Sequence, residues 1–255
     1  MTPITAVIIT FNEERNILRC IESLRGIADE IIVLDSFSTD KTQEICESLA
    51  QEMNLRFYKK EWIGYSHNKN YLNSLATHDY LFSIDADEAV DETLRAAILR
   101  EKTKGLRGTY SVNRLTNYCG KWIKHSGWYP DIKIRIFARS NAEWSGEYVH
   151  ETLEFKQKTE DKLLEGHLFH YSYYSFAEHR ARADKYSALT AIKMNANGKK
   201  ASFLKPYLSA LVRFLSMYLF SAGFLDGKMG YKIAVISAQS NVFKYQELRK
   251  LNKLK

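Results

Sequence analysis

Cysteine and proline are scarce in this chain. Its 255 residues include 3 cysteines and 3 prolines, and Cys20, Cys46 and Cys119 form no C-x-x-C pair. The chain opens on a strand-like run instead of a signal peptide, so we expect reduced thiols in a cytoplasmic protein. With 45% apolar and 26% charged residues, the composition excludes a disordered or fibrous chain and is typical of a globular domain.

A long uninterrupted apolar run is also missing. Residues 201–225 are rich in Phe, Leu, Tyr and Met, but Lys205, Pro206 and Arg213 interrupt them. The remaining stretch, 214–225, is shorter than the roughly 20 residues that a membrane span needs, and a central Lys or Arg costs roughly 2.5–3.5 kcal/mol on insertion. We therefore expect no transmembrane helix.

Acidic residues are scarce in the C-terminal part. Residues 179–255 contain 15 Lys or Arg and 3 Asp or Glu, whereas residues 1–178 contain 22 and 27. Basic groups around an apolar segment favour a helix lying on an anionic membrane surface, which predicts a peripheral protein on the inner face of the cytoplasmic membrane. The alternative is a helix packed on the rest of the chain or on a second copy in a homodimer.

The N-terminal part alternates short apolar runs with amphipathic segments. Continuous apolar strands separated by helices predict an α/β fold with a mostly parallel sheet that is covered on both faces. We expect this domain at residues 1–178 and a basic amphipathic helical extension at 179–255. The predicted strands are residues 6–9, 30–34, 55–58 and 80–84.

Polar clusters follow three of these strands. They are Asn12-Glu13-Glu14, Asp35 and Asp85-Ala86-Asp87, and ligands bind at the carboxyl ends of strands in such sheets. Helix capping explains Thr39 or Asp40 well. It explains the paired aspartates poorly, because two carboxylates in one crevice repel each other unless a cation or protons intervene. A hard divalent cation such as Mg²⁺ satisfies both.

These segments together resemble the family 2 glycosyltransferases, which have the GT-A fold. The match consists of residues 7–14 (VIITFNEE), 34–42 (LDSFSTDKT) and 83–88 (SIDADE). Residues 127–131 (GWYPD), 133–137 (KIRIF), 149–151 (VHE) and 168–171 (LFHY) are similar to the branch of lipopolysaccharide inner-core glucosyltransferases that act on heptose. Asp35-Ser36-Phe37-Ser38 departs from the Asp-Asp-Gly-Ser that is usual in the family.

The resemblance implies a binding site for a nucleotide-sugar donor, with a UDP-sugar expected. Glu13, Asp35 and the backbone of residues 9–11 would hold the base and ribose, and Lys69 would supply a cation to the diphosphate. Asp85 and Ala86 would complete the contacts. The donor site predicted in this way comprises Ile9, Thr10, Phe11, Glu13, Asp35, Lys69, Asp85 and Ala86.

The resemblance also implies a Mg²⁺ or Mn²⁺ ion. Asp87 would bind it directly, Asp85 would face the ribose or the water shell of the ion, and His170 would complete the ligands, unless it is a hydrogen-bonded core histidine. A bound cation offsets the charge that develops on a diphosphate leaving group. Glu88 we expect at a helix N-terminus, where the dipole favours an acid.

Catalysis and acceptor binding are assigned to later segments. Glu151 is the predicted base that takes the proton from the acceptor hydroxyl, with His150 as the alternative. Trp128, Tyr129 and Asp131 are predicted to form a platform for the acceptor sugar, although Trp128 also suits simple packing.

The expected activity is inverting transfer of glucose or another hexose from a UDP-sugar to a hydroxyl of a lipid-linked or lipopolysaccharide-core glycan. A sugar-phosphate nucleotidylyltransferase is the main rival, but it would carry a Gly-rich loop after the first strand, where residues 10–14 have none. A non-catalytic protein of the same fold would not need Asp85, Asp87 and Glu151. The basic tail lacks a motif that reads nucleic acid, so no nucleic-acid partner is expected.

Overall fold

The computed structural model describes residues 1–146 and 151–253, which form two compact units. The first unit comprises Met1–Arg114 and Asp131–His170, and the second comprises Leu115–Pro130 and the chain from Tyr171 onward. The division thus differs from the expected boundary after residue 178. Its physical reason is a shared core, since Tyr118 and Ile123 pack with Met217 and Ile233.

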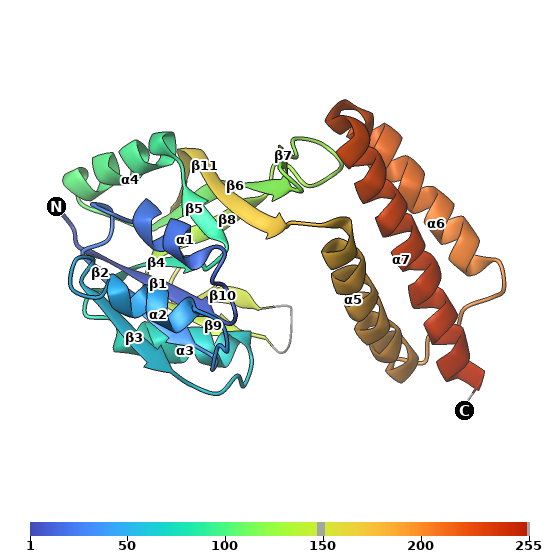
Figure 1. Ribbon diagram of the computed structural model, residues 1–255, viewed down its shortest axis with the longest axis horizontal. Helices are drawn as coiled ribbons and strands as arrows, with labels where there is room; N and C mark the ends of the chain where they lie inside the picture. Colours follow the sequence, from blue (N-terminus) through green and yellow to red (C-terminus); the bar gives the residue numbers. More distant parts are fainter. Residues whose placement is uncertain (147–150, 254–255) are drawn as a thin grey trace. The chain divides into compact units, whose positions relative to one another are not determined.

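A mixed sheet organises the first unit (Figure 1). Within the described residues it has nine strands in the order β3-β2-β1-β4-β8-β6-β11-β5, with β7 paired to β6. β1 runs parallel to β2 and β4, and β2 runs parallel to β3, whereas β8 pairs antiparallel with β4 and β6, and β5 with β11. The strands are β1 (Ile4–Thr10), β2 (Glu30–Asp35), β3 (Leu55–Lys59), β4 (Tyr80–Asp85), β5 (Glu88–Val90), β6 (Thr109–Tyr118), β7 (Lys121–Trp122), β8 (Ile132–Ala138) and β11 (Asp161–Tyr173). A separate hairpin joins β9 (Ala142–Ser145) to β10 (Thr152–Phe155).

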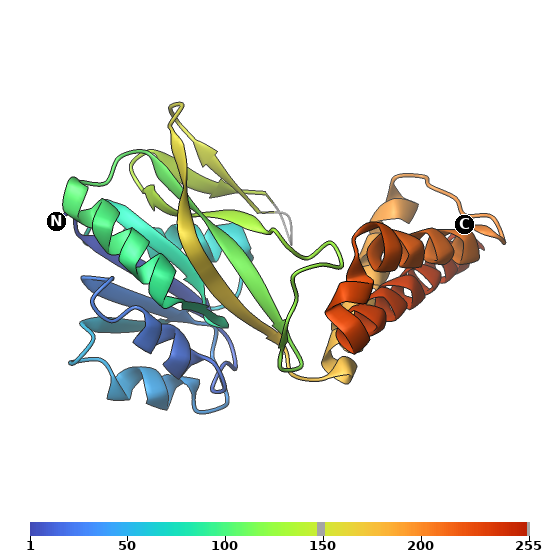
Figure 2. The same cartoon turned by 90° about the horizontal axis from the view of Figure 1, so that it is seen from above.

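The two faces of the sheet are covered by different helices (Figure 2). Because side chains alternate along a strand, Ile4, Ala6 and Ile8 face one cluster and Val7 faces the other. The first cluster is closed by α1 (Ile17–Ser23), α2 (Thr42–Ser48) and α4 (Glu92–Lys104), and the second by α3 (Tyr65–Leu75). Burial on both faces explains why β1 and β2 are apolar almost throughout.

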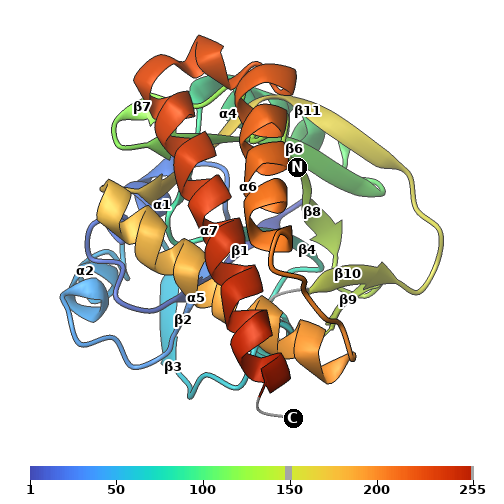
Figure 3. The ribbon, with the colours of Figure 1, turned by 90° about the vertical axis from the view of Figure 1, so that its right-hand side faces the viewer.

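Three long helices dominate the second unit: α5 (Phe176–Ala196), α6 (Lys205–Leu215) and α7 (Gly227–Lys253). α7 lies between α5 and α6 and contacts both (Figure 3). A π-helical turn, η1 (Ser216–Phe220), and a short 3₁₀ turn, η2 (Gly223–Asp226), connect α6 to α7. The connection is tight, since a Cβ on Gly230 would lie 1.9 Å from the carbonyl oxygen of Gly223.

Asp226 ties this connection to the segment 115–130 of the same unit. Its buried carboxylate accepts hydrogen bonds from the backbone N–H groups of Lys124 and His125, both at 3.1 Å, and from the Ser126 hydroxyl at 2.8 Å. Three donors on one buried carboxylate are a strong local constraint, because charge-assisted bonds are the stronger kind. α7 is therefore part of the folded unit.

No single helix within residues 1–146 and 151–253 combines the length and apolar character of a membrane span. The bent pair Lys205–Phe220 and Gly223–Lys253, with 72° between its halves, reaches both criteria only when taken together.

Candidate active site

The polar ends of β1, β2 and β4 lie at one edge of the sheet, as predicted. The parallel register pairs Thr10 with Asp35 and Ile9 with Asp85, so these strands end side by side. The side-chain oxygen of Thr10 is buried and, within the part of the chain that the structure describes, has no hydrogen-bond partner. An unpaired polar group at this edge is available to a ligand.

The loops after β1 and β2 hold each other. The backbone N–H groups of Asn12 and Glu13 donate to the hydroxyls of Ser38 and Thr42, both at 2.8 Å. Asp35 is fully buried, and its carboxylate accepts from the backbone N–H of Ser38 at 2.8 Å and from the hydroxyl of Ser38. Asp35 thus fixes the turn beside the predicted base site, while Phe11 is 56% exposed at its rim.

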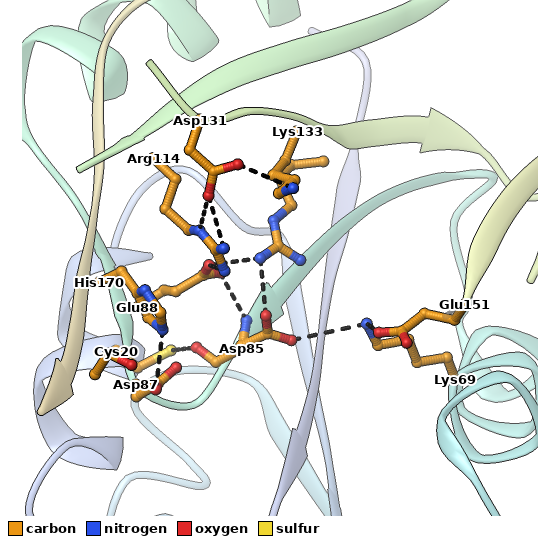
Figure 4. Close-up of polar contacts among 12 residues, drawn as sticks. Cys20, Lys69, Asp85, Asp87, Glu88, Arg114, Asp131, Lys133, Glu151 and His170 are labelled. Atoms are coloured by element: carbon orange, nitrogen blue, oxygen red, sulfur yellow. Dashed lines mark hydrogen bonds and ion pairs between the residues drawn. The ribbon is translucent and has the colours of Figure 1, made fainter. Parts of the chain in front are cut away.

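Asp85 stands at the centre of a buried charge network (Figure 4). Its Oδ2 accepts from the guanidinium of Arg135 at 2.8 Å, and the same guanidinium donates to Glu88 at 2.5 Å. Arg114 lies 3.4 Å from Glu88 and pairs with Asp131 at 2.7 Å. Glu88 also accepts from the backbone N–H of Asp85 at 3.0 Å, which fixes the turn between β4 and β5.

This network decides which carboxyl carries the charge. Burial opposes ionisation of Asp85, but the charges of Arg135 and then Lys69 hold its pKa well below its ordinary value. Burial and the neighbouring Asp85 instead raise the pKa of Glu88. Asp85 is therefore the firmly ionised group at the mouth of the site.

Asp87 and His170 form a second group beside the first. His170 lies on β11, whose register places it opposite Glu88 on β5, and its Nε2 is 3.2 Å from Oδ2 of Asp87. A carboxylate oxygen and an imidazole nitrogen suit Mn²⁺, and Mg²⁺ commonly takes one or two carboxylates beside phosphate oxygens. These two residues thus fit a divalent cation.

Asp85 does not join that pair, although all three residues were predicted around one ion. Its carboxylate is directed instead to Arg135 and Lys69. Among the described residues, no cluster of three or more His, Cys, Asp or Glu side chains suits a metal.

Lys69 links Asp85 to Glu151. Its ammonium is buried on α3, 3.4 Å from Oε1 of Glu151 and 3.8 Å from Oδ1 of Asp85. The ammonium also lies 4.4 Å from the ring centre of Trp144 on β9, a cation–π distance. The structure therefore brings together three residues that lie far apart in the sequence, each with a predicted catalytic or donor-binding role.

Other predicted residues are placed differently. Asp131 has its carboxylate engaged by Arg114 and by Lys133, the latter at 2.9 Å. Trp128 and Tyr129 belong to the second unit, where Trp128 packs edge-on against Tyr118, so their part in an acceptor platform stays a prediction. His150 lies outside the described residues.

The expectation for Glu88 was wrong. It begins the short strand β5 and is fully buried, whereas α4 starts at Glu92 and is capped by Asp91, which accepts from the Leu94 N–H at 2.7 Å. The stretch after Asp87 forms a strand because β11 supplies a partner for it, and local sequence does not reveal that partner.

Arg135 and Arg114 were missed by the sequence reasoning. Arg135 lies between Ile134 and Ile136 on β8 and is buried. A charged residue between strand-forming apolar residues requires a buried counter-charge, because an unpaired buried charge is costly. An arginine between two isoleucines was therefore the sequence pattern that could have indicated this ion pair.

Comparison with known proteins identifies the family of this chain. The sequence profile of glycosyl transferase family 2 matches residues 5–185. The chain is 28% identical to an uncharacterised glycosyltransferase of Rickettsia typhi, over 99% of this chain and 88% of that protein. It is also 28% identical to the lipopolysaccharide core biosynthesis glycosyltransferase LpsC of Rhizobium meliloti, over 92% and 90%. The crystal structure of S. aureus TarS 1–349 with UDP-GlcNAc has a TM-score of 0.51 and 12% identity, with 99% of this chain and 92% of that chain covered.

The chain therefore belongs to glycosyl transferase family 2. Its fold is GT-A with a C-terminal helical segment, as predicted, and it is a transferase.

The buried network makes a prediction about pH. Replacing Arg135 with Gln removes the cation that contacts both the fully buried Glu88 and the partly exposed Asp85, so we expect a loss of about 3–5 kcal/mol in the free energy of unfolding at pH 7. Without the cation, the folded-state pKa values of Asp85 and Glu88 rise, and protonation stabilises the folded variant at low pH. The deficit relative to the wild type should therefore shrink between pH 7 and pH 5.

Urea unfolding at the two pH values measures this. Arg100→Gln is the control, because Arg100 pairs with Glu165 on the surface and should cost less than about 1 kcal/mol. If Arg135→Gln is as stable as the wild type, or if its loss of stability grows between pH 7 and pH 5, Arg135 is not the cation that holds Asp85 ionised.

Proposed function

We propose that this glycosyltransferase moves a hexose, with inversion, from a UDP-sugar to a hydroxyl of a lipid-linked or lipopolysaccharide-core glycan. The observation that carries the proposal is the position of the Lys69 ammonium, 3.4 Å from Glu151 and 3.8 Å from Asp85, beyond the carboxyl end of β4. In this proposal Lys69 contacts the donor diphosphate, Glu151 is the base and Asp85 is the ionised aspartate, and all three lie close together.

The donor would lie across the ends of β1, β2 and β4. In this arrangement the unpaired Thr10 hydroxyl, the backbone from Ile9 to Phe11, and Glu13 contact the base and ribose. Asp35 fixes the turn beside them and Ala86 provides a close backbone approach. The UDP-GlcNAc in the TarS complex supports a uridine diphosphate sugar as donor.

Lys69 would contact the diphosphate. Its ammonium is held by two carboxylates and the Trp144 ring, so it is positioned before any ligand arrives. Preorganised charge of this kind stabilises the negative charge that develops on a leaving group.

Asp87 and His170 would hold Mg²⁺ or Mn²⁺ beside the diphosphate. When bound, the ion neutralises charge on the departing diphosphate. Asp85, held by Arg135, would face the ribose or the water shell of that ion. Its firmly ionised state keeps the site attractive to cations.

Glu151 would act as the base. The acceptor oxygen forms its bond to C1 of the sugar while the bond from C1 to the diphosphate breaks, and the electron pair of that bond leaves with the diphosphate. The hydroxyl proton passes to the Glu151 carboxylate. Attack from the face opposite the diphosphate inverts the configuration at C1.

The acceptor assignment rests on a relative and on Asp131. LpsC, named for lipopolysaccharide core biosynthesis, matches nearly the whole chain. Asp131 is held by Arg114 and Lys133, and in this proposal it accepts a hydrogen bond from a sugar hydroxyl in a fixed position. An acceptor of this kind agrees with action on the inner face of the cytoplasmic membrane.

The metal assignment predicts the behaviour of Asp87→Asn. Loss of the carboxylate should weaken Mn²⁺-stimulated UDP binding by at least about tenfold and leave the fold intact. Calorimetric titration of UDP with and without Mn²⁺ measures this. Glu165→Gln, an exposed charge change, is the control and should bind normally. Undiminished stimulation by Mn²⁺ in Asp87→Asn would remove Asp87 from the ion.

The base assignment predicts a separation of binding from turnover. Glu151→Gln keeps the shape of the side chain but cannot take a proton, so kcat should fall by about 10²–10⁴ while UDP affinity survives. Release of UDP, with glycan or water as acceptor, reports turnover. His150→Ala should cost less. Near-normal kcat in Glu151→Gln together with an inactive, folded His150→Ala would move the base to His150.

A further inference from the structure

Helix α6 presents its apolar side outward. Leu204 and the residues that follow it by three, four, seven and eight positions are each more than half exposed. This spacing places them on one face of a helix. In a globular protein such a stripe normally faces the core. The exposed residues of this face are Leu204, Tyr207, Leu208, Leu211 and Val212, and we call them the α6 face.

The exposed apolar surface continues around the turn after α6. Leu219 and Phe220 in η1 are exposed, Phe220 at 87%, and so are Phe224 and Leu225 in η2. An apolar surface of this extent on the charged second unit marks an interaction site.

A basic cavity lies among the helices α5, α6 and α7. Its volume is about 360 Å³, and α5, α6 and α7 all contribute to its wall. Six residues line it: Ala183, Arg213, Ser237, Ser240, Asn241 and Lys244. The lining therefore offers two cations, two hydroxyls and an amide, and contains no acid.

The positive charge of this cavity is not neutralised by the protein. Within residues 1–146 and 151–253, neither Arg213 nor Lys244 has a carboxylate within ion-pair distance; Lys244 donates only to the amide oxygen of Asn241, at 2.7 Å. Asp184, which follows Ala183 on α5, pairs with Arg180. Burial, followed by the charges of Arg213 and Lys205, lowers the pKa of Lys244. A bound anion would relieve this repulsion.

We propose that this cavity binds the phosphate of an anionic phospholipid headgroup while the α6 face enters the apolar layer of the same membrane. The choice of a lipid rests on charge and polarity: the basic cavity attracts a phosphate, and the exposed apolar α6 face of the same unit suits acyl chains. Basic pockets between helices are suited to phosphate headgroups, and apolar helix faces flanked by Lys and Arg lie in membrane interfaces.

The experiment uses the full chain and vesicles, without donor or acceptor, so its outcome is independent of the proposed sugar transfer. Binding to phosphatidylcholine vesicles containing phosphatidylglycerol is compared with binding to pure phosphatidylcholine by cosedimentation. The test variant is Arg213→Gln with Lys244→Gln. The control variant is Lys193→Gln with Lys253→Gln, which removes the same charge from two exposed positions on α5 and α7.

We expect the wild type to prefer vesicles with phosphatidylglycerol, and the cavity variant to lose about tenfold or more in affinity for them. The control variant should lose clearly less. UDP binding should be equal in both variants, which verifies that the first unit is intact. Val212→Glu should abolish vesicle binding through the α6 face.

Several outcomes would overturn the proposal. Equal losses in the two double variants indicate general attraction by the basic tail, without a site. A free-phosphate site is indicated if glycerol 3-phosphate raises the unfolding temperature of the wild type but not of the cavity variant, while no vesicle binding is seen. A dimer that hides the α6 face, detected by sedimentation equilibrium and lost in Val212→Glu, would assign the face to a second copy.

Discussion

The pairing of Arg135 with Asp85 and Glu88 is the constraint on which the site depends. Asp85 at the end of β4 is a partly buried carboxylate at the sheet edge, and the adjacent guanidinium of Arg135 stabilises its ionised form. Arg135 reaches it from β8, an antiparallel neighbour of β4. The antiparallel strand β8 therefore supplies the cation that faces the end of the parallel strand β4.

The same pairing arranges the groups on either side of it. Glu88, held by Arg135, fixes the turn between β4 and β5, and that turn carries Asp87 toward His170 on β11. On the other side, Oδ1 of Asp85 faces Lys69, which reaches Glu151. The residues proposed to hold the metal, the diphosphate and the proton are thus arranged around one carboxylate.

Sequence patterns predicted the parallel half of the fold well. β1, β2, β3 and β4 were found within one or two residues, because strands buried on both faces read as continuous apolar runs and the next loop is polar. The convergence of Asp35 and Asp85 with the end of β1 followed from parallel geometry alone. The family resemblance added Lys69, Glu151 and His170, which no local pattern would have selected.

The remaining features depend on pairing across long stretches of sequence. Arg135 is recognised only when β8 is known to adjoin β4, and Glu88 becomes a strand residue only through β11. Composition and charge indicated an amphipathic helical extension, but they could not tell which side of α6 faces the protein. The assignment of residues 115–130 to the helical unit likewise rests on Asp226, about 100 residues away.

The central claim is inverting transfer from a nucleotide-sugar, and the configuration of the released sugar tests it most directly. The enzyme is incubated with Mn²⁺ and UDP-α-glucose or UDP-α-N-acetylglucosamine, with water as acceptor, and proton NMR follows the anomeric signals from the earliest time. Glu151→Gln supplies the background. The account predicts that the β-anomer appears first and equilibrates later. Initial release of the α-anomer would contradict it.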